Sequence, residues 1–183
     1  PTIDPKKPYA LTKEEEDIME RLERAFENCE KLQRHMHFLL NKGGLYKVYN
    51  GNLLYHGCVP LKEDGNLKSV RIFGRAYKGK GLYEVLESYV RKGFYAMDPK
   101  EKERGKDIMW YIWLSENSPL FGKDKMATFE RYFLAEKETH KEKKNPYYLL
   151  LEDEKVVEKI LKEFGLENED AHIINGHVPV KCK

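Results

Sequence analysis

The sequence predicts an α+β chain that is mostly helical and carries a small antiparallel sheet. Several long segments repeat apolar residues at helical spacing, and an Asn-Gly dipeptide separates two short runs typical of β-strands. The composition, 35% charged and 40% hydrophobic, fits a helix-rich protein with a normal core and a charged surface. A disordered chain is excluded because 12% of the residues are aromatic. At 183 residues, one domain is the default expectation.

The charge and cysteine content narrow the possible partners and location. A net charge of +2 is too small to indicate nucleic acid, and no apolar run is long enough to suggest a membrane span. Cys29, Cys58 and Cys182 have unrelated spacings, which argues against a disulfide framework and favours the reducing cytoplasm. The chain starts at Pro1-Thr2 without a methionine, so we expect it to be a piece of a longer chain.

The first predicted element is one long helix. Thr12 and Glu15 form a capping box at its start, and Gly43-Gly44 ends it. Apolar residues recur along it at alternating spacings of four and three, which gives one continuous stripe. The members of this stripe are Ile18, Leu22, Ala25, Cys29, Leu32, Met36 and Leu39.

Two short strands are predicted to end in a histidine beside a glycine. Asn50-Gly51 predicts a type I′ hairpin between residues 45–49 and 53–56, and this hairpin delivers His56 just before Gly57. Near the carboxyl end, a predicted buried strand over 171–175 leads into Gly176-His177. One histidine at a strand end is more often structural than a ligand, but two such ends suggest one shared site. Neutral imidazole suits Mn, Fe, Zn or Ni.

Further elements are expected between these two motifs. A glycine-rich loop over 71–81 carries four cations and no acid, which suits either phosphate binding or simple solvation. Helices are expected over 82–95, from Asp98-Pro99 through a deeply buried stretch 108–114, over 126–134 and over 153–164. In the helix over 126–134, the side chains of Phe129, Tyr132 and Phe133 are expected to point inward.

These motifs resemble those of a known enzyme family. His56-Gly57-Cys58-Val59-Pro60 resembles the His-Gly-Gly loop of calcineurin-like binuclear metallophosphoesterases, and Gly176-His177-Val178-Pro179 resembles their closing Gly-His-Thr-Pro motif. The resemblance is strongest to the Firmicute-type, class III fructose-1,6-bisphosphatases, and it covers essentially the whole chain. Cys58 suits this subfamily, and Val178 replaces the common threonine. Other matching strings are Glu30-Lys31-Leu32-Gln33, Tyr49 to Cys58, Phe121 to Met126, Thr128 to Phe133, Lys144 to Tyr148 and Ile173 to Lys181.

The resemblance implies a role for each matched position. His56 and His177 would be ligands of the second metal of a binuclear Mn²⁺ site that hydrolyses fructose 1,6-bisphosphate to fructose 6-phosphate and phosphate, a gluconeogenic step. The sequence lacks the aspartates, bridging carboxylate, asparagine and acid histidine that the family needs, so most of the catalytic domain is missing. The isolated segment is therefore expected to be inactive, with no catalytic residue of its own.

The resemblance also implies a domain arrangement. The chain would be part of a metallophosphoesterase sandwich, with a long helix and hairpin over 1–61, a helical insertion over 66–150 and a closing helix and strand over 151–183. The insertion would lie over the active site and hold the phosphate that is not cleaved. The candidate phosphate-binding residues are Arg71, Arg75, Lys78, Lys80, Lys123 and Lys125.

Two alternatives stay open. The parent protein could act on another substrate, as a protein or dinucleotide polyphosphate phosphatase. The chain could instead be a non-catalytic helical interaction module in which both histidines are structural. Imidazoles of His56 and His177 that converge within about 5 Å would favour the shared metal site, since metal–nitrogen bonds are close to 2 Å.

Overall fold

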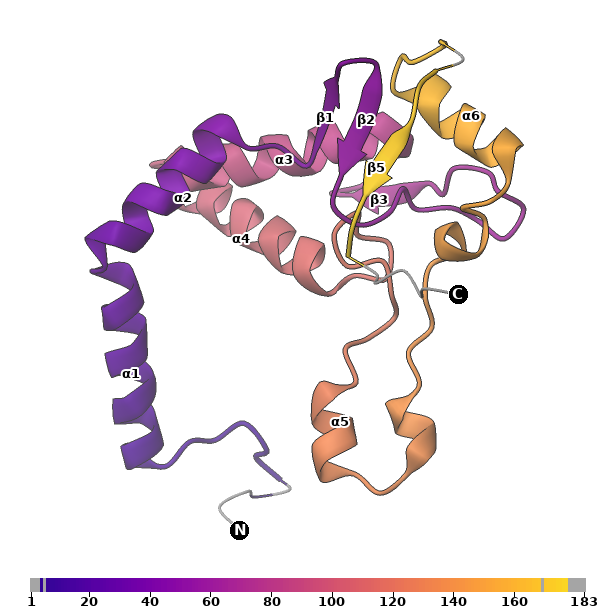
Figure 1. Ribbon diagram of the computed structural model, residues 1–183. Helices are drawn as coiled ribbons and strands as arrows, with labels where there is room; N and C mark the ends of the chain where they lie inside the picture. The colour runs from indigo at the N-terminus through magenta and orange to yellow at the C-terminus, as the bar shows by residue number, and fades with distance from the viewer. Residues whose placement is uncertain (1–3, 5, 169, 178–183) are drawn as a thin grey trace. The chain divides into compact units, whose positions relative to one another are not determined.

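The computed structural model describes residue 4, residues 6–168 and residues 170–177 (Figure 1). Val178 and Pro179, which complete the second histidine motif, and Cys182 lie outside these residues. The chain forms two compact units, Pro1–Gly43 and Gly44–Lys183, and each is described by itself. None of the described helices is both long and apolar enough to cross a membrane.

The first unit contains two helices, α1 (Lys13–Glu27) and α2 (Glu30–Lys42). The capping box is confirmed, because the Glu15 N–H donates to Thr12 Oγ1 at 3.3 Å and the Thr12 N–H donates to the Glu15 carboxylate at 2.7 Å. The prediction of one uninterrupted helix is wrong. Asn28 ends α1, and its side-chain amide donates to the Arg24 carbonyl at 2.8 Å, while Cys29 is extended, with ψ 96°. Asparagine favours helix ends because its amide bonds to nearby backbone.

The second unit holds a three-stranded sheet with β1 (Tyr46–Tyr49), β2 (Asn52–Tyr55) and β5 (Ile173–Asn175) in the order β1-β2-β5. The hairpin is confirmed, with φ of 49° at Asn50 and 73° at Gly51, as a type I′ turn requires. The expected fully antiparallel sheet is wrong, because β5 pairs with β2 in parallel. A hairpin fixes direction locally, whereas the long helical crossover that returns the chain to β2 permits parallel pairing.

The glycine-rich basic segment is a second hairpin rather than a loop. β3 (Val70–Ile72) and β4 (Arg75–Tyr77) pair in antiparallel fashion around Phe73-Gly74, whose φ values are 44° and 84°. The Phe73 ring packs edge-on against Tyr89 with centroids 4.9 Å apart, and the Arg104 guanidinium lies 5.6 Å from its centroid. These contacts hold a bulky residue in a left-handed conformation that a side chain normally disfavours.

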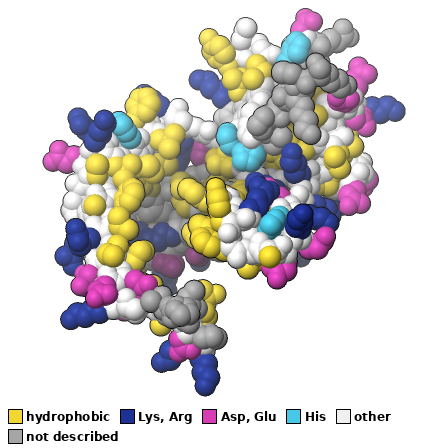
Figure 2. Space-filling view, turned by 60° about the horizontal axis from the view of Figure 1, so that its bottom comes forward, with side chains coloured by type: hydrophobic (Ala, Val, Ile, Leu, Met, Phe, Trp, Pro, Cys, Tyr) yellow, Lys and Arg dark blue, Asp and Glu magenta, His cyan; other side chains and the backbone are white. Residues whose placement is uncertain are grey.

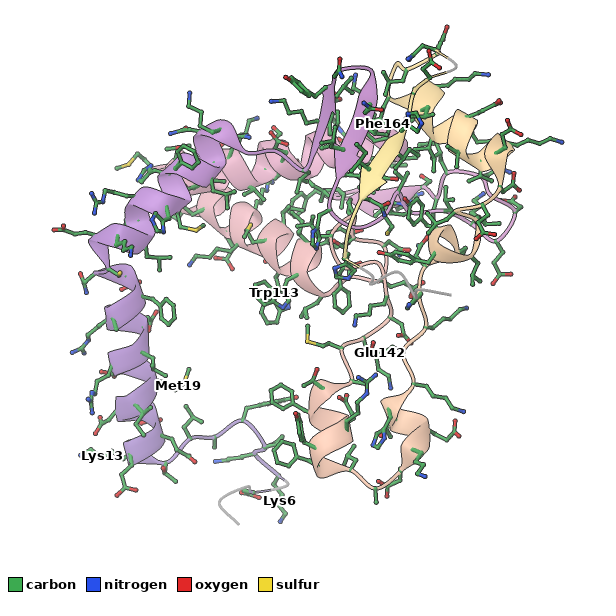
Figure 3. All side chains as sticks on the ribbon, in the orientation of Figure 1. Lys6, Lys13, Met19, Trp113, Glu142 and Phe164 are labelled. Atoms are coloured by element: carbon green, nitrogen blue, oxygen red, sulfur yellow. The ribbon has the colours of Figure 1, made fainter. Side chains whose placement is uncertain are left out.

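Two helices follow, α3 (Gly79–Tyr95) and α4 (Pro99–Leu114), and they pack closely side by side (Figure 1). Asp98 caps α4 as expected, accepting from the Lys100 N–H at 3.2 Å. The expected deep burial of residues 108–114 is wrong. Ile108 and Ile112 are buried, but Trp110 and Trp113 are 69% and 65% exposed (Figure 3). Only one face of α4 packs on α3, so the remaining apolar side chains stay outside.

Beyond α4, residues 123–144 leave the body of the unit and return to it, and we call them the arm. The arm is closed at its base by an antiparallel bridge between Lys123 and Lys144, and it contains α5 (Thr128–Phe133) and the 3₁₀ helix η1 (Lys137–His140) (Figure 1). The inward orientation predicted for Phe129, Tyr132 and Phe133 is wrong, because they are 73%, 79% and 78% exposed. A six-residue helix that packs mainly on the short helix η1 cannot cover three aromatic rings.

The chain then returns through η2 (Pro146–Leu149) and α6 (Glu154–Glu163). The larger of two apolar clusters joins β2, the segment after His56, α6 and two fully or nearly buried tyrosines, Tyr83 and Tyr147. The smaller cluster joins β3, α3 and α4. The Tyr83 hydroxyl donates to the Cys58 carbonyl at 2.9 Å, so the core holds the backbone two residues beyond His56. The α+β prediction is thus confirmed, while the metallophosphoesterase sandwich and the three-segment division stay predictions.

Candidate metal and phosphate site

The two histidines lie together at one edge of the sheet. β2 and β5 run parallel with Tyr55 opposite Asn175, so both strands end at the same edge, where His56 and His177 follow. His56 Nε2 and His177 Nδ1 are 3.0 Å apart, and the ring centroids are 4.9 Å apart at 72°. Both side chains are exposed, so this pair of imidazole nitrogens is accessible from solvent.

Backbone and side-chain hydrogen bonds tie the two histidine segments together. The Gly176 N–H donates to the His56 carbonyl at 3.0 Å, and the Asn175 side-chain amide donates to the Gly57 carbonyl at 2.9 Å. His177 has a φ of 66°, a left-handed conformation that is uncommon for a residue with a side chain. Such conformations persist where the surroundings determine them and cluster at functional sites.

A third segment supports the pair from the α4–arm connection. The Cys58 N–H donates to the Pro119 carbonyl at 2.9 Å, and a Cβ atom on Gly57 would lie 2.4 Å from that same oxygen. Glycine is therefore required after His56 because a side chain there would collide with backbone. Burial raises the pKa of the Cys58 thiol to about 12, so this sulfur is a packing group and not a thiolate ligand.

The surroundings of His177 favour its neutral form. Partial burial is the main cause that lowers the pKa of His177, and the neighbouring His56, Lys123 and Lys144 lower it further. A hydrogen bond with the Phe121 backbone acts in the opposite direction. Because the neutral imidazole keeps a nitrogen lone pair, it is the form that binds metal ions.

Of the predicted cations in the arm, Lys123 lies near the histidines and Lys125 is engaged elsewhere. Lys123 Nζ pairs with the Glu142 carboxylate at 2.9 Å and lies 5.5 Å from the Phe121 ring centroid. Lys125 Nζ donates to the Thr139 carbonyl at 2.6 Å, which joins the two sides of the arm.

The four predicted cations of the basic segment lie on and after the β3–β4 hairpin. Arg71 and Arg75 are exposed on its two strands, Lys78 precedes α3, and Lys80 lies in the first turn of α3. Lys80 Nζ lies 3.8 Å from Glu84. None of these four is among the charges that act on His177, whereas Lys123 and Lys144 are.

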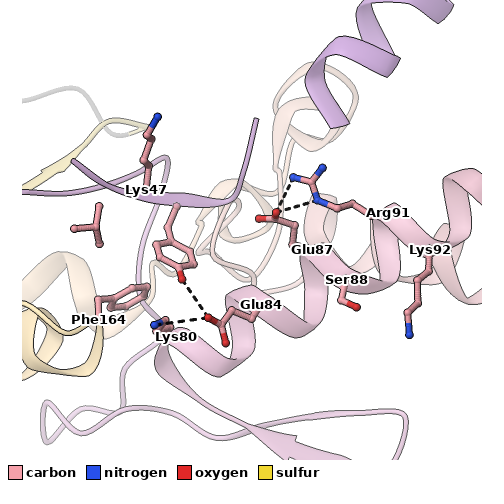
Figure 4. Close-up of a pocket in the computed structure, with 10 residues that line it drawn as sticks. Lys47, Lys80, Glu84, Glu87, Ser88, Arg91, Lys92 and Phe164 are labelled. Atoms are coloured by element: carbon pink, nitrogen blue, oxygen red, sulfur yellow. Dashed lines mark hydrogen bonds and ion pairs between the residues drawn. The ribbon is translucent and has the colours of Figure 1, made fainter. Parts of the chain in front are cut away.

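A groove between β1 and α3 offers a different hollow, of about 810 Å³ (Figure 4). Both of its carboxylates are paired within the groove, since Glu87 binds Arg91 at 2.7 Å and Glu84 accepts from the Tyr46 hydroxyl at 3.2 Å. The histidine pair is the better candidate site because its two imidazole nitrogens converge and are exposed.

Sequence reasoning missed three contributors to the site, namely Asn175, the 118–122 loop and Lys144. Asn175 directly precedes Gly176-His177, so its position beside the second histidine motif could have indicated that it belongs to the site. Lys144 begins the matching string Lys144-Asn145-Pro146-Tyr147-Tyr148, but nothing in that string marks the lysine as part of the site. Its position opposite Lys123 depends on the return of the arm, which local sequence does not encode.

The histidine pair fits two ligands of one metal ion. Two nitrogens bonded to one ion at about 2.1 Å, with an angle between 90° and 110°, lie about 3.0–3.4 Å apart, and the observed separation is 3.0 Å. Across residues 4, 6–168 and 170–177, no cluster contains three or more histidine, cysteine, aspartate or glutamate side chains that could hold a metal. A metal ion held by the two imidazoles would therefore need further ligands from outside the described residues.

A strand-end imidazole pair with lysines nearby is a pattern typical of proteins that bind metal ions and phosphate groups. Comparison with known families is more specific, because the model of the Firmicute fructose-1,6-bisphosphatase family matches residues 1–183. The chain therefore belongs to this family, which confirms the resemblance.

Curated relatives support the same family assignment. The chain is 55% identical over 184 residues to "Fructose-1,6-bisphosphatase class 3" of Clostridioides difficile (strain 630), with 100% of this chain and 28% of the relative covered. The protein of the same name from Clostridium botulinum (strain Hall) is 54% identical with the same coverage. That of Listeria innocua is 53% identical over 183 residues, covering 99% of this chain and 28% of the relative. The chain thus spans 28% of the length of these relatives. No solved structure matches the chain.

Proposed function

We propose that this chain is a segment of a cytoplasmic, metal-dependent fructose-1,6-bisphosphatase that hydrolyses fructose 1,6-bisphosphate to fructose 6-phosphate and phosphate in gluconeogenesis. The observation that carries the proposal is the 3.0 Å approach of His56 and His177 in a chain of this family. The relatives' names specify the substrate, and the imidazole pair supplies ligands of the kind that phosphate-ester hydrolysis with two metals requires.

The histidine pair would hold one ion of a binuclear Mn²⁺ site. When bound, the ions supply Lewis-acid polarisation of phosphoryl oxygens and an activated water. His56 and His177 offer nitrogens at the same edge of the sheet. The Gly176 and Asn175 hydrogen bonds hold the two backbone segments together and so keep those nitrogens close to each other. Partial burial lowers the pKa of His177, which favours the neutral form that carries a lone pair.

The remaining parts of the site would come from the rest of the parent protein. The described residues hold no third ligand beside the pair, and the chain covers 28% of its relatives. We infer that the isolated chain is inactive, that residues 1–61 and 151–183 belong to the metallophosphoesterase sandwich, and that residues 66–150 form an insertion over the active site.

The two predicted phosphate-binding lysines of the arm both bond within it, Lys123 to the Glu142 carboxylate at 2.9 Å and Lys125 to the Thr139 carbonyl at 2.6 Å. The charge of Lys123 also acts on His177. Arg71, Arg75, Lys78 and Lys80 are proposed to bind the phosphate that is not cleaved, a role that their exposure permits.

The test uses the full-length parent enzyme. Wild type with Mn²⁺ is expected to hydrolyse fructose 1,6-bisphosphate, and His56→Ala and His177→Ala are each expected to lower kcat by more than about a hundredfold, since metal ligands position the reacting groups. Both variants should also bind less Mn²⁺, while His37→Ala, a histidine of α2, should change neither. Normal activity and metal content in both variants would refute the role of the pair.

Two alternatives have distinct outcomes. A screen in which a phosphoprotein or a dinucleotide polyphosphate is hydrolysed in preference to fructose 1,6-bisphosphate would reassign the substrate but keep the metal site. A full-length protein that binds no metal and hydrolyses no phosphate ester would leave both histidines as a structural hydrogen-bonded pair. The family membership and the convergence of the imidazoles favour the enzyme.

A further inference from the structure

Two lysines face each other where the arm leaves and rejoins the body of the second unit. Lys123 and Lys144 form an antiparallel bridge, which neighbouring backbone bonds extend on both sides. The Asn145 N–H donates to the Gly122 carbonyl and the Asp124 N–H to the Lys143 carbonyl, both at 2.9 Å. The backbone at Lys144 is therefore fixed, although its side chain is exposed.

The two lysines differ in whether a carboxylate neutralises their charge. Glu142 neutralises Lys123 at 2.9 Å, with side chains that are only 23% and 16% exposed, and the same carboxylate also accepts from the Ala127 N–H at 2.8 Å (Figure 3). Lys144, in contrast, has no carboxylate within ion-pair distance among the residues that the structure describes. Within the part of the chain that the structure describes, no carboxylate compensates its charge.

An aromatic ring restricts where the Lys144 ammonium lies. Lys144 Nζ is 5.9 Å from the centroid of Tyr148, a contact of cation–π type. The Tyr148 ring is itself held edge-on to the buried Tyr147, with centroids 5.3 Å apart. Gly122 leaves the room for it, since a Cβ there would lie 3.1 Å from the Tyr148 hydroxyl oxygen.

The Lys144 ammonium is also close to the histidine pair. Phe121, whose backbone bonds to His177, is followed by Gly122, and the Gly122 carbonyl accepts from the residue after Lys144. The charge of Lys144 consequently acts on the His177 ring. A cation that is pre-positioned by Tyr148 and has no ion-pair partner among the described residues makes a region of positive potential that favours an anion.

We propose that Lys144 binds a phosphate oxygen of the phosphate ester that occupies the histidine site, through a charge-assisted hydrogen bond. This inference rests on the proposed function for the identity of the ester. The presence of a phosphate group on the ligand does not depend on that function. Lys123 is the structural member of the lysine pair, because its ammonium is committed to Glu142, and Lys144 is the binding member.

The test measures inorganic phosphate affinity and steady-state kinetics of the full-length parent enzyme. Lys144→Met is expected to raise the Kd for phosphate and the KM for fructose 1,6-bisphosphate by about tenfold or more, the usual effect of losing a hydrogen bond to a charged group. Lys144→Arg should recover most of the affinity. Bound Mn²⁺ should not change, because the lysine is not a ligand.

Lys143→Met is the matched control, since Lys143 is the preceding residue of the same extended segment and is also exposed. It is expected to change both constants less than twofold, within the effect of a neutral surface substitution. Equal constants for Lys144→Met and Lys143→Met would overturn the proposal. So would a loss of Mn²⁺ in Lys144→Met that Lys144→Arg does not restore, because the lysine would then act on folding of the site.

Failure of this inference is distinguishable from failure of the proposed function. If wild type hydrolyses fructose 1,6-bisphosphate and Lys144→Met binds phosphate normally, the enzyme assignment stands and the lysine assignment is wrong. If wild type does not hydrolyse fructose 1,6-bisphosphate but Lys144→Met selectively weakens phosphate binding, the lysine assignment stands and the substrate is a different phosphate ester.

Discussion

The first 43 residues and the rest of the chain achieve helical structure by different means. No residue of α1 or α2 is buried, and apolar side chains such as Met19 and Phe26 are 53% and 64% exposed. Figure 3 shows Met19 on α1, and Figure 2 shows hydrophobic side chains lying on the surface. In α3, by contrast, Leu82, Tyr83 and Leu86 are completely buried. Local signals specify the first unit, such as the capping box and the Glu20–Arg24 ion pair, whereas long-range packing specifies the second.

This difference matters for the candidate site. The hydrogen bonds described above at the His56 and His177 segments join residues far apart in the sequence, including the Asn175 bond to the Gly57 carbonyl and the Cys58 bond to the Pro119 carbonyl. The site therefore belongs to the packed unit and depends on its cooperativity. Substitutions in the two units should therefore differ in the size of their effect on stability and in how far along the chain that effect extends.

The largest effect is expected at the α3–α4 contact. A Cβ on Gly93 would lie 2.5 Å from the Gly105 Cα, and both are backbone positions that cannot move independently. Gly93→Val should destabilise the second unit by about 3 kcal/mol, the upper range for overpacking, as measured by urea denaturation followed by circular dichroism. Gly81→Ala in the same helix has nothing within 4 Å of the new Cβ and should stabilise slightly. A Gly93→Val chain as stable as Gly81→Ala would mean that the two helices do not pack this closely.

A smaller effect is expected in the arm, where one carboxylate joins both sides. Glu142 binds Lys123, the Ala127 N–H and Arg131, and its hydrogen bond to Lys123 is the main cause that lowers its pKa from the ordinary value of 4.5. Glu142→Gln should destabilise the arm by about 2 kcal/mol, as for a hydrogen bond to a charged group. Amide hydrogen exchange at Ala127 would report this loss.

The same carboxylate predicts a pH dependence. Because the folded pKa lies below the unfolded one, the stabilisation is complete above pH 4.5 and is lost as the pH falls through the folded pKa. Exchange protection in the arm should therefore decline in acid for wild type, whereas Glu142→Gln should show a flat profile over the same range. An equal decline in both proteins would assign the acid sensitivity to another group.

Sequence patterns predicted the elements that local chemistry determines. Asn50-Gly51, Thr12 with Glu15, and Asp98-Pro99 each specify a turn or cap within a few residues, and all three are confirmed. The patterns failed where partners decide the outcome. The direction of β5 depends on a distant crossover, and the exposure of Trp110 and Trp113 depends on which face of α4 meets α3.

The candidate site likewise has residues that local sequence patterns predict and residues whose role only the packing of distant segments reveals. The two histidines were predicted from strand ends followed or preceded by glycine, and the structure places their nitrogens 3.0 Å apart. Lys144 was not predicted, because its neighbourhood is created by the bridge to Lys123 and by the ring of Tyr148. A charged run read in isolation contains no information about which of its members faces a site.

The first unit should respond locally to loss of its cap. Thr12→Ala removes the side-chain acceptor for the Glu15 N–H and should cost about 1 kcal/mol, the typical value for an N-cap. Hydrogen exchange should accelerate in the first turn of α1, while the urea midpoint of the second unit stays unchanged. Thr12→Ser retains the hydroxyl and serves as the control. A shift in the second unit's midpoint would show that the two units unfold together.

The smallest effect is expected from one methylene group removed at matched positions of the two units. Ile160 in α6 is 1% exposed, so Ile160→Val should cost about 1 kcal/mol through lost burial and a small cavity. Ile18 in α1 is 53% exposed, and Ile18→Val should change the free energy of unfolding by less than about 0.5 kcal/mol. Denaturation of both variants under identical conditions gives the comparison directly. Equal costs would show that the apolar face of α1 is covered in solution, and the contrast between a locally specified unit and a packed one would then no longer hold.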